Sequence, residues 1–199
     1  MFRIIRLEDR IVLEADAANL ATGLDSSYGS LPSDSGAEGK EIFDQNNTAK
    51  LLVVSDNLAQ SEVLAQAADV DTSVLKYDPT SIDLSSLLDS IALTLDGKQA
   101  SSIALATHSQ GVGGISLFDD LAVNTDTLLS DVNLQNFFSA LGDMVDEEGR
   151  IDILACSAGA ESSNQTMELA LEAVTNRNVA LSDDPTGNGE SGGDWILES

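Results

Sequence analysis

Two side chains suited to nucleophilic catalysis each follow directly on a short apolar run of the sequence. His108 follows SIALAT at 102–107, and Cys156 follows IDILA at 151–155. Each is the only residue of its type in the chain, and small residues come after both. Ligands of open parallel sheets bind beyond the carboxyl ends of the strands. If the two runs are neighbouring strands, we therefore expect the imidazole and the thiol to face one cleft.

This pair fits the chemistry of a cysteine nucleophile. A thiol attacks as its thiolate, and a nearby imidazole can accept the thiol proton or protonate the leaving group. Backbone N–H groups of a small-residue loop, here Gly111, Gly113 and Gly114, can stabilise an oxyanion. A structural alternative stays open, because a single cysteine after a strand often serves as a small buried hydrophobe. A single histidine likewise often has only a structural role.

A serine nucleophile is the competing interpretation of the same stretch. THSQG at 107–111 has the outline of the Gly-x-Ser-x-Gly turn of serine hydrolases, but Thr107 replaces the first glycine. A β-branched side chain then stands where the strained turn has least room. That chemistry also needs a histidine late in the chain to accept the serine proton, and the chain has no second histidine. We therefore favour the cysteine.

The charge of the chain limits its partners. Its 34 Asp and Glu residues against 9 Lys and Arg give a formal net charge of -25. A surface this negative repels phosphate backbones and anionic lipid, which disfavours nucleic acid and membrane surfaces as partners. No apolar run approaches the ~18 residues of a membrane span. Residues 1–21 are interrupted by charges and lack the apolar stretch of a secretory signal.

Apolar runs and amphipathic stretches alternate after a polar segment. Residues 22–49 are rich in Ser, Gly, Asp and Asn, which predicts a flexible linker. From residue 50 onward the alternation predicts an α/β domain with a mostly parallel sheet of about six strands, covered on both faces. A short hairpin is expected around 115–118. The expected strands are 51–54, 72–76, 102–107, 151–155, 178–182 and 194–197, and the expected helices are 58–68, 82–95, 131–146 and 162–176.

One acidic loop invites a metal interpretation. Carboxylates at Asp183, Asp184, Glu190 and Asp194 stand among turn glycines and are suitable oxygen ligands for calcium. Their spacing does not fit the twelve-residue helix-loop-helix calcium pattern. A solvated, turn-rich loop is the alternative that we favour, and we expect no other cofactor.

The order of the two chemical residues resembles a known superfamily. A strand, histidine and Gly-rich loop followed by a strand ending Ala-Cys is similar to the caspase, gingipain and clostripain cysteine peptidases. More closely, residues 51–198 resemble the bacterial domain of unknown function 4347, a relative of that superfamily. The matching pieces are LLVVSD (51–56), IALATHSQG (103–111), ISL (115–117), ILACSAG (153–159) and DDPTGNGESGGDWILE (183–198).

The start of the chain carries a second resemblance. LEDRIVL at 7–13 is similar to the Leu-Glu-Pro-Arg-x-Leu-Leu segment that opens many giant bacterial surface or secreted proteins, with Asp9 replacing proline. This resemblance implies a LEPR-XLL-like segment at 1–21 and a longer polypeptide beyond the caspase-like domain at 50–199. It also implies an extracellular or cell-surface location after export without a cleaved signal peptide.

Together the resemblances imply a three-layer, caspase-like fold with strands in flavodoxin-like order. The implied activity is that of a cysteine endopeptidase, with Cys156 as nucleophile and His108 as acid and base. Its substrate would be a protein or peptide, with its own chain as one candidate. Asp183 or Asp184 would favour Lys or Arg in a specificity pocket. The alternative is an inactive module for secretion, surface retention or adhesion, and the two residues that separate His108 from the next glycine support it.

Overall fold

The computed structural model describes residues 48–110, 113–156, 158, 164–182 and 197 of the chain. Five strands in this part form one parallel sheet with the order β2-β1-β3-β7-β8. The inner strand β1 reads AKLLVVS and buries its last five residues, as expected of a parallel strand covered on both faces. The strands are β1 (Ala49–Ser55), β2 (Thr72–Tyr77), β3 (Ala100–Ala106), β7 (Val145–Leu154) and β8 (Asn178–Leu181).

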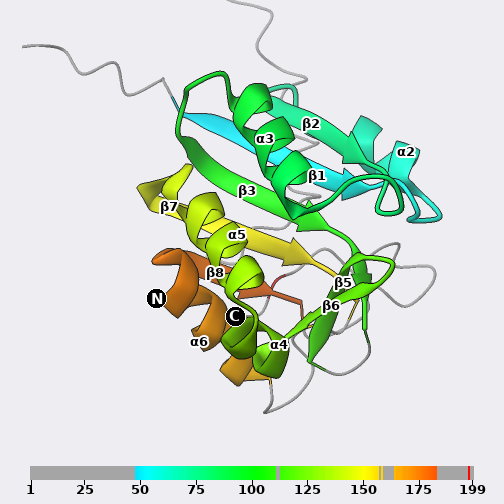
Figure 1. The fold of residues 1–199 in the computed structure, drawn as a ribbon. Coiled ribbons are helices and arrows are strands. Elements are labelled where there is room, and N and C mark those ends of the chain that lie inside the picture. The colour runs from blue at the N-terminus through cyan, green and yellow to red at the C-terminus, as the bar shows by residue number, and fades with distance from the viewer. Residues whose placement is uncertain (1–47, 111–112, 157, 159–163, 183–196, 198–199) are drawn as a thin grey trace, which may run out of the picture.

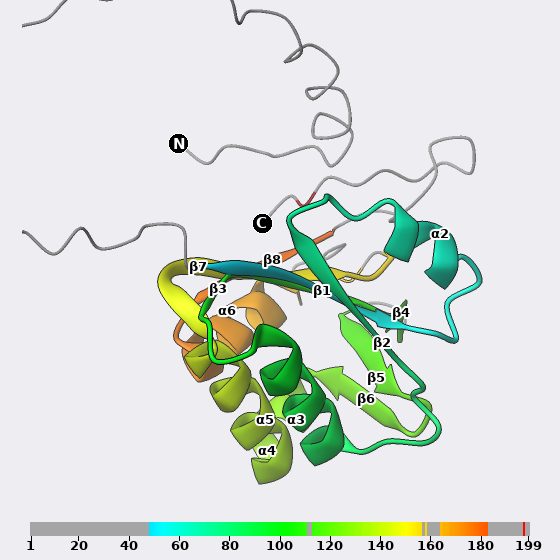
Figure 2. The same cartoon turned by 90° about the horizontal axis from the view of Figure 1, so that it is seen from above.

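The helices lie on both faces of this sheet. The step from β1 to β2 runs toward one edge, and all later steps run toward the other edge. Because such crossovers are right-handed, the first crossover helix must lie on the opposite face from the later ones. Figure 2 shows this arrangement, with α2 on one side of the sheet and the other helices on the other side. The helices are α2 (Ser61–Gln66), α3 (Leu84–Leu95), α4 (Thr125–Ser130), α5 (Val132–Asp143) and α6 (Asn164–Thr175).

A small antiparallel sheet follows β3 directly. It consists of β4 (His108–Ser109), β5 (Gly114–Phe118) and β6 (Leu121–Asn124), in that order. In Figure 1 it stands beyond the arrowhead of β3, at the carboxyl ends of the parallel strands. The chain thus adds a hairpin at the edge of the main sheet where ligands of open α/β sheets bind.

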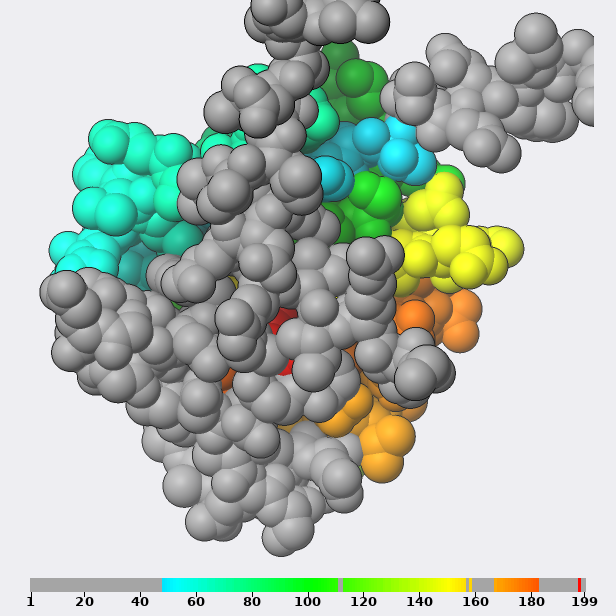
Figure 3. Space-filling model, turned by 180° about the vertical axis from the view of Figure 1, so that it is seen from behind, coloured from blue at the N-terminus to red at the C-terminus, as the bar shows by residue number. Residues whose placement is uncertain are grey.

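Two apolar clusters cover the two faces of the parallel sheet. The larger one joins the sheet to α3, α4, α5 and α6 and includes Leu51, Val53, Ile103 and Leu105. The alternate residues Leu52, Val54 and Ala106 belong to a smaller cluster with Leu64 of α2 and Leu154 of β7. This division follows the period of two along a strand. Seen from behind, α2 lies on one flank of the second face and the start of β7 on the other (Figure 3).

The predicted α/β class, the mostly parallel sheet and the flavodoxin-like strand order are confirmed. The hairpin expected around 115–118 is present as β5 and β6. The predicted strand 194–197 lies outside the described residues except for Leu197. No helix in the described ranges is long and apolar enough to cross a membrane.

Two boundaries differ from the expectation. The helix expected at 131–146 ends at Asp143, because β7 begins at Val145 rather than at Ile151. β7 pairs with β3 at Val145 and again from Arg150, and the polar residues between them lie in a register irregularity that an apolar pattern does not reveal. The short helix α4 was not expected, although Asn124 caps it.

Candidate functional site

His108 and Cys156 leave the sheet from equivalent positions on neighbouring strands. β3 and β7 are adjacent and parallel, and their last registered pair is Ala106 with Leu154. His108 and Cys156 each come two residues after that pair. Both side chains are exposed. The condition that the two strands be neighbours is therefore met, and the two side chains lie at the same edge of the sheet.

The backbone of His108 is held by the small sheet. His108 is the first residue of β4 and pairs with Ser116 of β5. The preceding residue, Thr107, is buried, and its hydroxyl donates to the carbonyl oxygen of Ser116. The amide of Thr107 donates to the carbonyl oxygen of Leu154 at 3.2 Å. These bonds tie the end of β3 to both the hairpin and β7, so the starting direction of His108 is fixed.

The imidazole of His108 lies against the loop that follows β1. Its Nε2 is 3.5 Å from the carbonyl oxygen of Asn57, which is long for a hydrogen bond. When Nε2 carries the ring proton, it donates to this carbonyl and leaves Nδ1 as the basic nitrogen. The contact crosses from the end of β1 to the end of β3, where the strand order reverses and ligands bind in folds of this kind.

The side chain of Asn57 braces that loop, which the sequence reasoning missed. The hydroxyl of Ser55 donates to Asn57 Oδ1 at 2.8 Å, and Asn57 Nδ2 donates to Asp119 Oδ1 at 3.2 Å. Asp119 lies in the turn between β5 and β6. The loop after β1 is thereby joined to the small sheet, whose strand β4 carries His108. The sequence alone offers only Ser-Asp-Asn at 55–57, between an apolar run and the helix expected at 58–68.

A buried tyrosine supports the same corner from β2. The hydroxyl of Tyr77 donates to the carbonyl oxygen of Leu117 at 2.8 Å, and its ring meets Phe118 edge-on at 6.0 Å. Burial raises the pKa of Tyr77, and the charge of Asp56 adds to this effect. At neutral pH Tyr77 is therefore a neutral donor that anchors β5, the strand that pairs with His108.

The proposed oxyanion loop is only partly described. Gly113 has a φ of +79°, which favours glycine, and the carbonyl of Gly114 accepts from Gln110 N–H at 2.9 Å. A Cβ on Gly114 would lie 3.2 Å from the carbonyl oxygen of Val123. Gly111 lies outside the described residues. After Cys156, the amide of Ala158 donates to the carbonyl of Ala155 at 3.1 Å, so the chain turns sharply there.

The acidic candidates cannot be placed in this site. Asp183, Asp184, Glu190 and Asp194 all lie outside the described residues. Within the part of the chain that is described, no three His, Cys, Asp or Glu side chains are grouped to hold a metal ion.

Comparisons with known proteins place the chain in a family. No curated protein matches it. A solved structure, the Streptococcus pneumonia TIGR4 flavodoxin, matches at 13% identity and a TM-score of 0.35, covering 72% of this chain and 89% of the flavodoxin. A likeness this weak carries no argument, and the strand order described above rests on the sheet itself. Residues 51–199 match the family described as Domain of unknown function (DUF4347), and the chain belongs to that family.

Proposed function

We propose that this domain is a cysteine endopeptidase in which Cys156 is the nucleophile and His108 transfers the protons. The observation that carries the proposal is the placement of both residues, exposed, two positions beyond the registered pair Ala106 and Leu154 of adjacent parallel strands. Neighbouring strands lie ~4.8 Å apart, so residues that leave such strands at the same level start close together. The resemblance to the caspase and gingipain peptidases supports the same assignment.

The proposed reaction has two halves. His108 accepts the Cys156 proton, and the thiolate adds to the substrate carbonyl carbon, forming a C–S bond. The tetrahedral intermediate collapses, the C–N bond breaks, and the imidazolium gives its proton to the leaving amine. Water then attacks the thioester while His108 accepts one of its protons. The C–S bond breaks, the carboxylic product leaves, and the proton held by His108 returns to the Cys156 sulfur.

The surroundings of His108 support its part in this chemistry. The Asn57 carbonyl can accept from Nε2–H and thus orient the ring, as a base needs a third group to hold it. Asn57 is itself braced by Ser55 and Asp119. The ring is therefore placed by groups from β1, β3 and the small sheet together.

A second candidate function is an inactive caspase-like module for secretion, surface retention or adhesion. The observation that favours it lies just after His108. The backbone there pairs with β5, and Gln110 N–H is engaged with the Gly114 carbonyl, so this amide is not available to an oxyanion. An active enzyme then needs its oxyanion donors from elsewhere, for example from the turn after Cys156.

The proposed substrate is a peptide segment, and the chain's own residues 22–49 are one candidate. Asp183 and Asp184, which follow β8, are the proposed basis for cleavage after Lys or Arg. We further propose that the domain works outside the cell, as part of a longer exported polypeptide, on the resemblance of residues 7–13.

Intact mass over time tests the enzyme proposal. Wild type, Cys156→Ala and His108→Ala are incubated with calcium or with a chelator, alone and with a library of fluorogenic peptides. We expect only the wild type to cleave, and the cut site gives the specificity. Gln66→Ala, an exposed change on α2, is the matched control and should cleave like wild type.

Alkylation separates the two candidate functions. At neutral pH we expect iodoacetamide to modify Cys156 several-fold more slowly in His108→Ala than in wild type, because the imidazole generates the thiolate. Equal alkylation rates together with no cleavage would reject the enzyme and leave the inactive module.

A further inference from the structure

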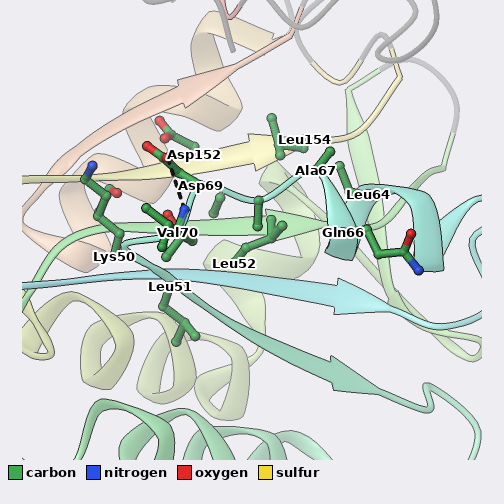
Figure 4. Close-up of a pocket in the computed structure, with 14 residues that line it drawn as sticks. Lys50, Leu51, Leu52, Leu64, Gln66, Ala67, Asp69, Val70, Asp152 and Leu154 are labelled. Atoms are coloured by element: carbon green, nitrogen blue, oxygen red, sulfur yellow. Dashed lines mark hydrogen bonds between the residues drawn. The ribbon is translucent and has the colours of Figure 1, made fainter. Parts of the chain in front are cut away.

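The second face of the parallel sheet carries an apolar groove. It has a volume of about 380 Å³ and runs between α2 and the strands β1, β3 and β7. Leu64 of α2 and Ala67, which caps the end of α2, form one wall, and Leu52, Ala104 and Leu154 form the floor. Figure 4 shows the groove, with Leu51 pointing away toward the helices on the other face. We call this surface the α2-side groove.

One described residue from the end of the chain already lies against this surface. Leu197 is partly buried and packs on the cluster formed by Leu52, Val54, Leu64, Ala106 and Leu154. Three members of that cluster, Leu52, Leu64 and Leu154, also line the α2-side groove. The contact made by Leu197 is therefore continuous with the groove. The C-terminal segment is thus the occupant that the structure indicates.

We propose that Trp195 fills the α2-side groove and fastens the C-terminal segment across the sheet. Residues two apart in an extended segment share a face, so an extended 195–197 would present Trp195 to the face on which Leu197 packs. The chain can reach, because the stretch from Ser182 to Leu197 spans roughly 50 Å when extended. An aromatic side chain buries about 150–250 Å² of surface, and the apolar residues that line the groove can cover it.

The groove carries charged side chains as well as apolar ones. Lys50 lines the groove and forms no ion pair with any residue that the structure describes. Asp69 and Asp152 also line the groove, so its charge is mixed, and the proposal rests on its apolar lining and on the contact of Leu197. This inference concerns the face opposite α3 and α5 and does not depend on whether Cys156 is catalytic.

The chain offers a direct readout, because Trp195 is its only tryptophan. In the full chain we expect the tryptophan emission maximum to lie at a shorter wavelength than that of free N-acetyl-tryptophanamide. We also expect an acrylamide quenching constant several-fold lower than that of the free compound. Emission and quenching equal to those of the free compound would overturn the proposal. Shielding that disappears on dilution, as the protein turns from dimer to monomer, would assign the groove to a second copy and also overturn it.

A variant that fills the groove tests the location. Ala104→Leu adds bulk to the floor without removing a core side chain, so it should displace the indole and raise the quenching constant several-fold. If circular dichroism shows that Ala104→Leu does not fold, Ala67→Leu replaces it, because this change adds bulk from the wall of the groove rather than from its floor. Ala92→Leu, the same change on the exposed side of α3, should leave quenching unchanged. If a folded groove variant keeps Trp195 fully shielded, the indole lies elsewhere and the proposal is wrong.

Discussion

Replacing Gly142 by alanine should destabilise the domain, because α5 and α6 meet there with no room for a side chain. A Cβ on Gly142 would lie 2.0 Å from the carbonyl oxygen of Thr175 and 2.8 Å from its carbonyl carbon. Ordinary contact begins near 3.4 Å, so the two helices must separate by about 1.4 Å, the difference between 3.4 and 2.0 Å. The obstacle is backbone, and no rotamer change can relieve it.

The expected change in the free energy of unfolding is the difference between two opposing effects. Overpacking a well-packed site costs about 1–3 kcal/mol, and the upper part of that range applies because backbone has to move. Alanine recovers about 1 kcal/mol of helix propensity relative to glycine. We therefore expect Gly142→Ala to lower the free energy of unfolding by about 2 kcal/mol. For a domain of this size that corresponds to a melting temperature lower by about 4–8 °C.

Urea titration and thermal melting by circular dichroism measure the effect. Ser139→Ala is the matched control, because Ser139 is exposed on the same helix and should gain about 0.5 kcal/mol from propensity alone. A Gly142→Ala protein as stable as wild type would refute the close approach of α5 to Thr175. The consequence reaches the candidate site, because α5 leads into β7, the strand that precedes Cys156.

Three further predictions concern the carboxyl edge of the sheet and its support. Asn57→Ala removes the side chain that holds the loop after β1. The imidazole resonances of His108, the only histidine, should therefore shift and broaden in proton NMR, while the melting temperature changes little. Unchanged resonances would show that Asn57 does not position the ring. Tyr77 has a raised pKa, so its contribution to stability is complete below pH ~10 and is lost as the pH rises through the folded-state value. Tyr77→Phe should lower the free energy of unfolding by about 1 kcal/mol at neutral pH, because a hydrogen bond is lost. In urea titrations the variant should also lose less stability than wild type as the pH rises above ~10. An equal alkaline loss of stability in the two proteins would contradict this role of Tyr77. Asn124→Ala breaks the capping box with Thr127 and should lower the free energy of unfolding by about 1 kcal/mol, with Asn136→Ala on the exposed side of α5 as control.

The strands of the main sheet were predictable because burial on both faces leaves a simple pattern. Runs such as 51–54 and 102–107 are apolar without alternation and are bounded by polar turns, as buried parallel strands are. The start of β7 was not predictable in this way. Residues 146–148 of that strand are partly or fully exposed and acidic, and they lie in the register irregularity between Val145 and Arg150, the residues that pair with β3.

Contacts between distant segments could not be predicted from the pattern at all. Asn57 and Asp119 are 62 positions apart, and their hydrogen bond depends on how the hairpin folds over the end of β1. Gly142 likewise looks like a weak point in a helix, whereas its lack of a side chain is what lets Thr175 approach. Sequence periodicity reports burial along one element, and these features arise where two elements meet.

The candidate dyad lies between these two cases. That His108 and Cys156 end strands was evident from the sequence, and the sheet order then places β3 between β1 and β7. His108 accordingly has the Asn57 carbonyl on its β1 side and Cys156 on its β7 side. If Nε2 donates to Asn57, only Nδ1 remains to exchange a proton with the thiol. The orientation of one ring, which no sequence pattern encodes, therefore decides whether two well-placed residues act as one catalytic pair.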